Sequence, residues 1–192
     1  MDIVAKSGER AAGPTTAGAA PMYDLIELFF FAYRDFVGDA DRLLETYRFG
    51  RAHHRVLHFV SRQPGLTIAE LLEILKITKQ SLNRVLKELI AESFIEARAG
   101  AQDRRHRQLH TTAKGARLAK DLALLQTRRF SRAMGALGDG GRERAIAFLL
   151  AMVDDHEREH VIALIGARDL NASEPGGNSS SAPVQGQIGE KA

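Results

Sequence analysis

The sequence predicts a mostly α-helical protein with a small β-hairpin, and three observations support this fold class. Apolar residues recur at intervals of three and four, the spacing of one helix face, over most of residues 22–166. Between residues 94 and 111 that spacing gives way to two short strand-like runs around an arginine-rich loop. Residues 1–21 and 168–192 hold many small residues and no periodicity, and we expect them to be disordered tails.

The composition limits the classes of protein to which the chain can belong. Its 192 residues are enough for one domain with a substantial core. The longest apolar stretch, residues 25–37, is interrupted by Glu27, Arg34 and Asp35, so no membrane span is expected. There is no cysteine, which excludes disulfides and thiol switches, and no signal peptide is recognisable. We therefore expect a cytoplasmic protein, and the sequence implies no cofactor.

The first predicted helix starts near Met22 and has a wide apolar face. Phe30 and Phe31 extend this face beyond one stripe, which is more apolar surface than a small domain covers by itself. We therefore assign residues 22–49 to an N-terminal dimerisation helix, with an ordinary core helix as the alternative. The stripe itself consists of Leu25, Ile26, Phe29, Tyr33, Phe36 and Val37.

Two shorter helices are expected next. The first spans residues 51–62, and Pro64 ends it because the residue before a proline avoids the helical conformation. Thr67 and Glu70 have the spacing of a capping box, which marks the start of the second helix. Residues 76–77 then make the turn into the following helix.

The helix from Thr78 to Ala91 combines an apolar stripe with a second face of long hydrogen-bond donors. A loop with three arginines, residues 100–107, lies between the two strand-like runs that follow. A donor-rich helix beside a basic hairpin suits the major groove of DNA and the adjacent phosphates. The expected DNA-binding residues are Thr78, Lys79, Gln80, Ser81, Asn83 and Arg84 at the bases, Lys87 nearer the backbone, and Arg104, Arg105 and Arg107 in the hairpin.

The distribution of charge agrees with this assignment. The net charge of the whole chain is only +3, but residues 50–120 hold 14 Lys and Arg against 6 Asp and Glu. Both flanking regions are acidic on balance. The basic residues are therefore concentrated in the segment that has the groove-binding pattern, which favours double-stranded DNA as the partner over a merely solvated basic face.

This segment resembles the winged helix-turn-helix of the MarR family of bacterial transcription regulators. The resemblance rests on the helix at 78–91, on Asp103, Arg104 and Arg105 in the wing, and on Thr112, Lys114 and Gly115 at the start of the next helix. It extends more loosely over residues 24–165. Two positions depart from the family pattern: Ser93 stands where a glycine is usual, and Thr111 stands where an apolar residue is usual.

The resemblance implies a domain organisation and a function. A winged helix-turn-helix DNA-binding domain would occupy residues 50–112, with dimerisation helices on either side of it. The protein would be a homodimeric, effector-responsive transcription regulator that binds an inverted-repeat operator and is not an enzyme. Asp103 would brace the wing arginine. A winged-helix module that binds proteins and not DNA is the alternative.

The resemblance also implies that a small-molecule effector would bind in the crevice between the dimer helices and the winged domain. His54 and His58 are four residues apart and share a helix face, and together with Tyr33 they are the candidate effector-binding residues. Surface or partly buried histidines without a ligand remain the alternative interpretation.

Two further helices are expected after the wing, at residues 112–137 and 142–166, separated by three glycines between residues 138 and 141. We assign residues 113–167 to C-terminal dimerisation helices. Residues 156–160 also match the H-E-x-x-H pattern of zinc proteases. A third ligand is missing nearby, so a zinc hydrolase is disfavoured, and His156 and His160 remain weak candidates for a structural or regulatory metal site.

Overall fold

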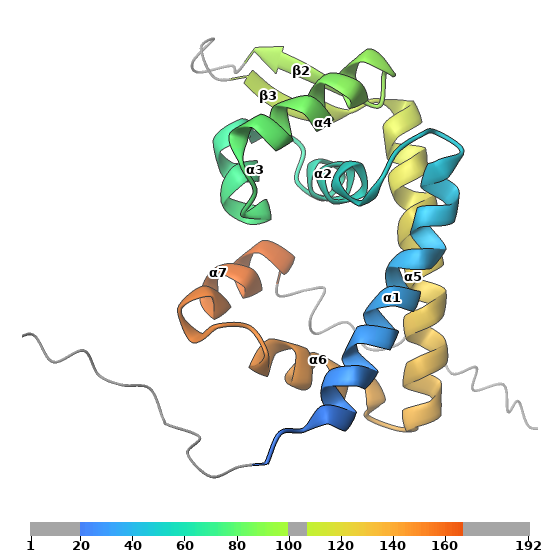
Figure 1. Ribbon diagram of the computed structural model, residues 1–192. Coiled ribbons are helices and arrows are strands. Elements are labelled where there is room, and N and C mark those ends of the chain that lie inside the picture. The colour runs from blue at the N-terminus through green and yellow to red at the C-terminus, as the bar shows by residue number, and fades with distance from the viewer. Residues whose placement is uncertain (1–19, 100–106, 167–192) are drawn as a thin grey trace, which may run out of the picture. The chain divides into compact units, whose positions relative to one another are not determined.

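The computed structural model describes residues 20–99 and 107–166. The predicted tails, Asp103, Arg104 and Arg105 lie outside the described residues, apart from residues 20 and 21 at one end. The chain forms two compact units, residues 1–130 and 131–192. In chain order the elements are α1 (Tyr23–Glu45), α2 (Arg51–Arg62), β1 (Leu66–Thr67), α3 (Ile68–Leu75), α4 (Lys79–Ala91), β2 (Ile95–Ala99), β3 (Arg107–Thr111), α5 (Ala113–Leu137), α6 (Gly141–Ala151) and α7 (Asp155–Ile165) (Figure 1).

The helix-turn-helix begins with the expected capping box. The backbone N–H of Thr67 donates to Glu70 Oε2 at 2.7 Å, and the Glu70 N–H donates to Thr67 Oγ1 at 3.3 Å. The bonds that the Thr67 N–H and hydroxyl donate to this carboxylate favour its charged form and hold the pKa of Glu70 below its usual value. Lys76 has a φ of 50°, and this left-handed residue turns the chain from α3 into α4.

The wing hairpin is part of a three-stranded antiparallel sheet with the order β1-β3-β2. The sequence did not predict β1, because a strand of two residues has no periodicity of its own. Its pairing with β3 places Leu66 opposite Leu109. Gly65 turns the chain into this pairing with a φ of 98°, and its N–H donates to the Leu109 carbonyl at 2.8 Å.

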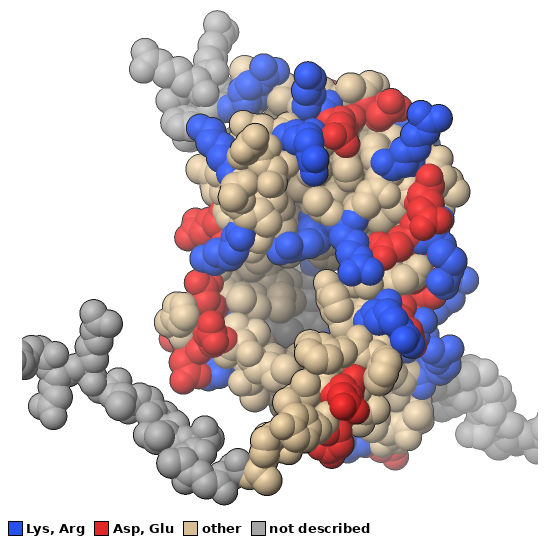
Figure 2. Space-filling view, viewed as in Figure 1, with Lys and Arg blue, Asp and Glu red and all other residues tan. Residues whose placement is uncertain are grey.

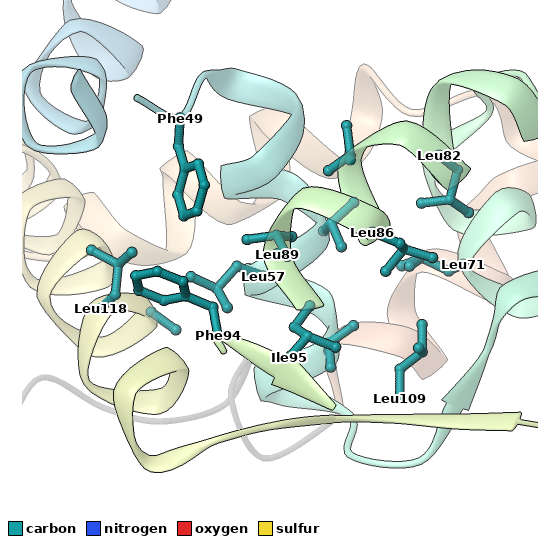
Figure 3. Close-up of a cluster of buried hydrophobic side chains, with 14 of the residues drawn as sticks. Phe49, Leu57, Leu71, Leu82, Leu86, Leu89, Phe94, Ile95, Leu109 and Leu118 are labelled. Atoms are coloured by element: carbon teal, nitrogen blue, oxygen red, sulfur yellow. The ribbon is translucent and has the colours of Figure 1, made fainter. Parts of the chain in front are cut away.

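One apolar core joins all the elements of the winged region. Side chains from α2, α3, α4, β2, β3 and α5 point toward one another in Figure 3. Leu82, Leu89, Phe94 and Leu109 are each at most 1% exposed. Full burial of a side chain of this size contributes roughly 1.5–3 kcal/mol, so this core fixes the position of α4 from beneath.

Helices α1 and α5 pack side by side in the first unit. Gly38 does not interrupt α1, which continues to Glu45. Arg129 Nε and Nη2 both contact Asp39 Oδ2, at 2.9 and 2.7 Å. The hydrogen bond from Arg129, with the charges of Arg129 and Arg42, holds the pKa of the Asp39 carboxyl below its usual value against a smaller opposing effect of burial.

The second unit corrects one prediction. We expected a single helix over residues 142–166, but the chain forms α6 and α7 with a break at residues 152–154. Arg158 accounts for this break, since its guanidinium donates to the carbonyls of Leu150 and Val153 and also pairs with Asp155. Carbonyls at a helix end lack partners within the helix, and the Arg158 side chain supplies donors to these two. None of the helices in the described ranges is long and apolar enough to cross a membrane.

Candidate nucleic-acid interface

The two faces of α4 differ as its sequence predicts. Its apolar side chains, Leu82, Val85, Leu86 and Leu89, are buried in the core. The donor face is exposed at every predicted contact position from Thr78 to Lys87. Thr78 and Ser81 also form the start of the helix, where the Ser81 N–H donates to Thr78 Oγ1 at 3.2 Å. The exposed side chains that remain on this face are Lys79, Gln80, Asn83, Arg84 and Lys87.

The carboxyl end of α4 is tied to the start of α5. Ser93, in the place of the usual glycine, adopts a left-handed φ of 58°, and the N–H of Phe94 donates to the Leu89 carbonyl at 2.8 Å. Thr112 Oγ1 donates to the Ser93 carbonyl at 2.7 Å. Lys114 donates to the carbonyl of Glu92 at 2.9 Å, and its ammonium also lies 4.0 Å from the centre of the Phe94 ring. These contacts hold α4 at a fixed angle to α5.

The threonine and glycine that open α5 have distinct physical roles. The Gly115 N–H donates to Thr112 Oγ1 at 3.1 Å, so Thr112 caps the helix. A Cβ atom at Gly115 would lie 2.0 Å from the Phe94 carbonyl oxygen. Only glycine permits this approach, and the motif noted at residues 112–115 is thereby explained by the packing of α5 against the strand start at Phe94.

A groove of about 650 Å³ separates the second half of α4 from the sheet. Its floor is apolar, and Asn83, Lys87 and Arg107 stand along it. Arg107 Nη2 donates to the Ala97 carbonyl at 3.1 Å, which holds the guanidinium against the neighbouring strand. Glu96 also lines the groove but pairs with Arg98. The described part of the wing therefore places one arginine beside the two polar side chains of α4.

Basic side chains lie over the region of α4, β2 and β3, at the top of Figure 2, with acidic side chains among them. They continue along the start of α5, where Lys114, Arg117 and Lys120 are exposed. Cationic side chains of this kind attract the phosphates of nucleic acid from a distance.

The three candidate effector residues line one pocket. Tyr33 of α1 and His54 and His58 of α2 border a cavity of about 300 Å³. Burial lowers the pKa of both histidines below 6.5, helped by repulsion from His58 at His54 and from Arg62 at His58; Asp41 opposes the shift at His54. Both imidazoles therefore favour the neutral form.

Sequence reasoning missed the other side chains of this pocket. Arg51 and Arg55 line it from α2, Phe36 from α1 and Gln126 from α5. Arg51 and Arg55 were predictable from the sequence, since residues 51, 54, 55 and 58 form one stripe at helical spacing. Gln126 was not, because only the packing of α5 brings it to the cavity.

The H-E-x-x-H residues of α7 show no metal site. His156 and His160 are both exposed. His156 Nε2 lies 3.7 Å from the Glu157 carboxylate, and the described ranges contain no group of three potential ligands.

Comparisons with known proteins agree with the fold. A family model for the MarR family matches residues 49–106. The chain is 47% identical, over 135 residues, to the HTH-type transcriptional regulator PetP of Rhodobacter capsulatus, covering 70% of this chain and 81% of PetP. The fold is similar to the regulator SlyA, with a TM-score of 0.59, 17% identity and coverage of 72% of this chain and 99% of SlyA. It is also similar to BpsR of Bordetella bronchiseptica, whose DNA binding is regulated by 6-hydroxynicotinic acid, with a TM-score of 0.54, 18% identity and coverage of 68% and 99%. The chain belongs to the MarR family of winged helix-turn-helix transcription regulators.

Proposed function

We propose that the protein is a homodimer that binds an inverted-repeat operator in the cytoplasm. Its affinity for this operator changes when a small aromatic acid binds. The observation that carries this proposal is the exposed donor face of α4, held from beneath by the core and at its end by α5. In this proposal Lys79, Gln80, Ser81, Asn83 and Arg84 contact base edges in the major groove, and Thr78 lies at the helix start beside them. Lys87 and Arg107 contact phosphates across the groove.

The wing is part of the same proposal. Arg104 and Arg105 would enter the minor groove or contact phosphates beside it, and Asp103 would hold the wing arginine in place. Such contacts position the protein on the duplex and respond to groove width. The wing therefore complements the base contacts of α4.

The homodimer accounts for the apolar face of α1. Its first half exposes large apolar side chains, including Phe30 at 66%, Leu28 at 63% and Phe31 at 54%. A contiguous face of this kind is uncommon on a soluble monomer and is typical of an interface. We assign the exposed apolar side chains Phe148 and Leu149 of α6, Met152 at its C-terminal end and Ile165 of α7 to the same function.

The pocket between α1, α2 and α5 suits a small aromatic acid. Tyr33, Phe36 and Phe59 provide aromatic walls, and Arg51, Arg55 and the two histidines provide donors for a carboxylate. The similarity to BpsR, which responds to 6-hydroxynicotinic acid, supports this class of ligand.

The operator can be identified by selection from random DNA. Wild-type protein is incubated with a pool of random-sequence duplexes at physiological salt, and the bound duplexes are sequenced. We expect inverted repeats with half-site centres about 10 base pairs apart, since two recognition helices related by a two-fold axis enter successive major grooves. Inserting about five base pairs between the half-sites rotates one groove to the far side and should abolish tight binding.

The salt dependence of DNA binding tests the electrostatic contribution of the basic side chains. Affinity should fall steeply as salt rises, because bound Lys and Arg release counterions from the phosphates. A pool that remains random after selection would exclude sequence-specific binding and would favour a protein-binding winged helix. Enrichment of single, unrepeated sites would exclude the symmetric dimer.

A further inference from the structure

A histidine outside the pocket joins α2 to the recognition helix. His53 Nε2 lies 2.7 Å from Glu88 Oε2 of α4. On the opposite side of the ring, Nδ1 accepts the backbone N–H of Gly50 at 3.1 Å. The ring stacks on Phe49 with centroids 4.6 Å apart, and the His53 side chain is only 12% exposed. The imidazole is thus held on three sides.

These contacts define the form of the ring. A backbone N–H is always a donor, so Nδ1 carries the lone pair and the proton of the neutral ring is on Nε2. The Nε2–H then donates to a carboxylate, which is a charge-assisted hydrogen bond. Such bonds have a preferred direction, unlike apolar packing.

Glu88 has no evident purpose in DNA binding itself. It is the single acidic residue within α4, and the exposed side chains from Lys79 to Lys87 all carry donors. A carboxylate close to phosphates weakens DNA binding by repulsion. Its bond to His53 gives it another role.

We propose that His53 is a positioning residue for α4, which sets the rotation of the recognition helix about its own axis through Glu88. The apolar contacts of Leu82, Val85 and Leu89 keep α4 on the core but are non-directional. The hydrogen bonds at the carboxyl end of α4 fix its angle to α5, and the His53–Glu88 bond adds a further directional contact that orients the donor face. This inference rests on the proposed function, in which α4 contacts the operator bases.

The residue that follows His53 on α2 borders the candidate effector pocket. His54, the next residue along α2, lines the pocket on the other side of the helix. The bond from His53 therefore connects the recognition helix to the same helical turn that borders the candidate effector site.

The test uses matched variants of α4 and two DNA probes. Glu88→Ala and Glu92→Ala each remove one negative charge from the same end of the helix, but only Glu88 accepts from His53. Dissociation constants are measured for a duplex selected by the wild-type protein and for an unrelated duplex of equal length. Glu92→Ala should tighten both complexes equally. Glu88→Ala should reduce the ratio of specific to non-specific affinity by about three- to tenfold, the size expected for a lost charge-assisted contact.

Substitutions of His53 separate positioning from stability. Gln can place an amide N–H near the position of Nε2, whereas Asn can replace the acceptor at Nδ1 but is too short to reach Glu88. We expect His53→Gln to keep most of the discrimination and His53→Asn to lose it. Melting temperatures are recorded for every variant.

Three outcomes are decisive. If the affinity ratio follows the melting temperature across the variants, His53 has only a structural role and the proposal is wrong. Equal ratios for Glu88→Ala and Glu92→Ala would overturn it as well. If the wild-type protein selects no duplex, the proposed operator binding fails, which is a different result from failure of the positioning role.

Discussion

The winged region and the first half of α1 are both rich in apolar residues, but only one of them completes its own core. Phe94 in the winged region is 1% exposed, whereas Phe30 in α1 is 66% exposed. Phe30 belongs to a segment with apolar residues at helical spacing, and Phe94 starts a short strand-like apolar run. The contrast shows that one copy of the chain completes the core of its winged region but leaves the apolar face of α1 uncovered. A second copy is the partner that we propose for the latter.

The largest expected effect concerns the winged region. Gly115→Ala should destabilise the protein by about 3 kcal/mol or more, because the new Cβ would lie 2.0 Å from the Phe94 carbonyl oxygen. Neither atom can move away without a shift of the main chain. Gly135→Ala in the same helix is the matched control, since nothing lies within 4 Å of its Cβ position. It should stabilise by roughly 0.5–1 kcal/mol, the helix preference of alanine over glycine.

Chemical denaturation at one fixed protein concentration measures both variants. Opposite signs are expected. Equal destabilisation would mean that glycine is needed along α5 for a reason other than the contact with Phe94.

The next effect concerns the first half of α1. Phe30→Glu should weaken the dimer by about 2 kcal/mol or more, because the carboxylate would be desolvated without a partner in an apolar interface. Ile90→Glu is the control, since Ile90 is 41% exposed but lies on α4, outside the proposed interface. Sedimentation across a range of concentrations gives both dissociation constants. A wild-type monomer, or equal weakening by the two variants, would remove α1 from the interface.

The sequence predicted the winged region well because local signals and long-range packing agree there. The capping box at Thr67 and Glu70, the two faces of α4 and the arginine-rich hairpin are each visible within a few residues. The strand β1 was missed because its two residues depend on pairing with β3. The break between α6 and α7 was missed because it depends on Arg158, whose side chain reaches back to carbonyls five and eight residues earlier.

The contact between His53 and Glu88 shows the same limit at the site. Thirty-five residues separate the two side chains, and neither position has a local pattern that predicts the pair. The pocket was predicted in part. Two residues of its stripe on α2 were predicted, whereas the position of Gln126 of α5 depends on the packing of two distant helices. Positions fixed by spacing along one element were predictable, and positions fixed by packing between elements were not.

The pocket lies where the two compared regions meet, and its histidines make the protein sensitive to pH. Their pKa values in the folded protein are lowered from 6.5, so the unfolded chain takes up protons more readily. The stability that the neutral histidines provide is complete above pH 6.5. It is lost as the pH falls from 6.5 through the lower pKa values of the folded state. A variant with both His54→Gln and His58→Gln should lose less stability over that range than the wild type.

The smallest expected effect, and the one that connects the two regions, is the pH dependence of ligand binding. An aromatic carboxylate in the pocket stabilises the imidazolium form, so its binding raises the lowered pKa values of His54 and His58 and takes up protons. Under the proposed function, the affinity for an aromatic carboxylate, with 6-hydroxynicotinate as the test compound, should therefore rise roughly two- to fivefold as the pH falls from about 7.5 to 6. Calorimetry in buffers of different ionisation enthalpy measures the proton uptake directly. The double Gln variant should show weaker binding with little pH dependence, while Arg51 and Arg55 remain to hold the carboxylate. Equal proton uptake by the wild type and this variant would mean that the histidines do not face the ligand.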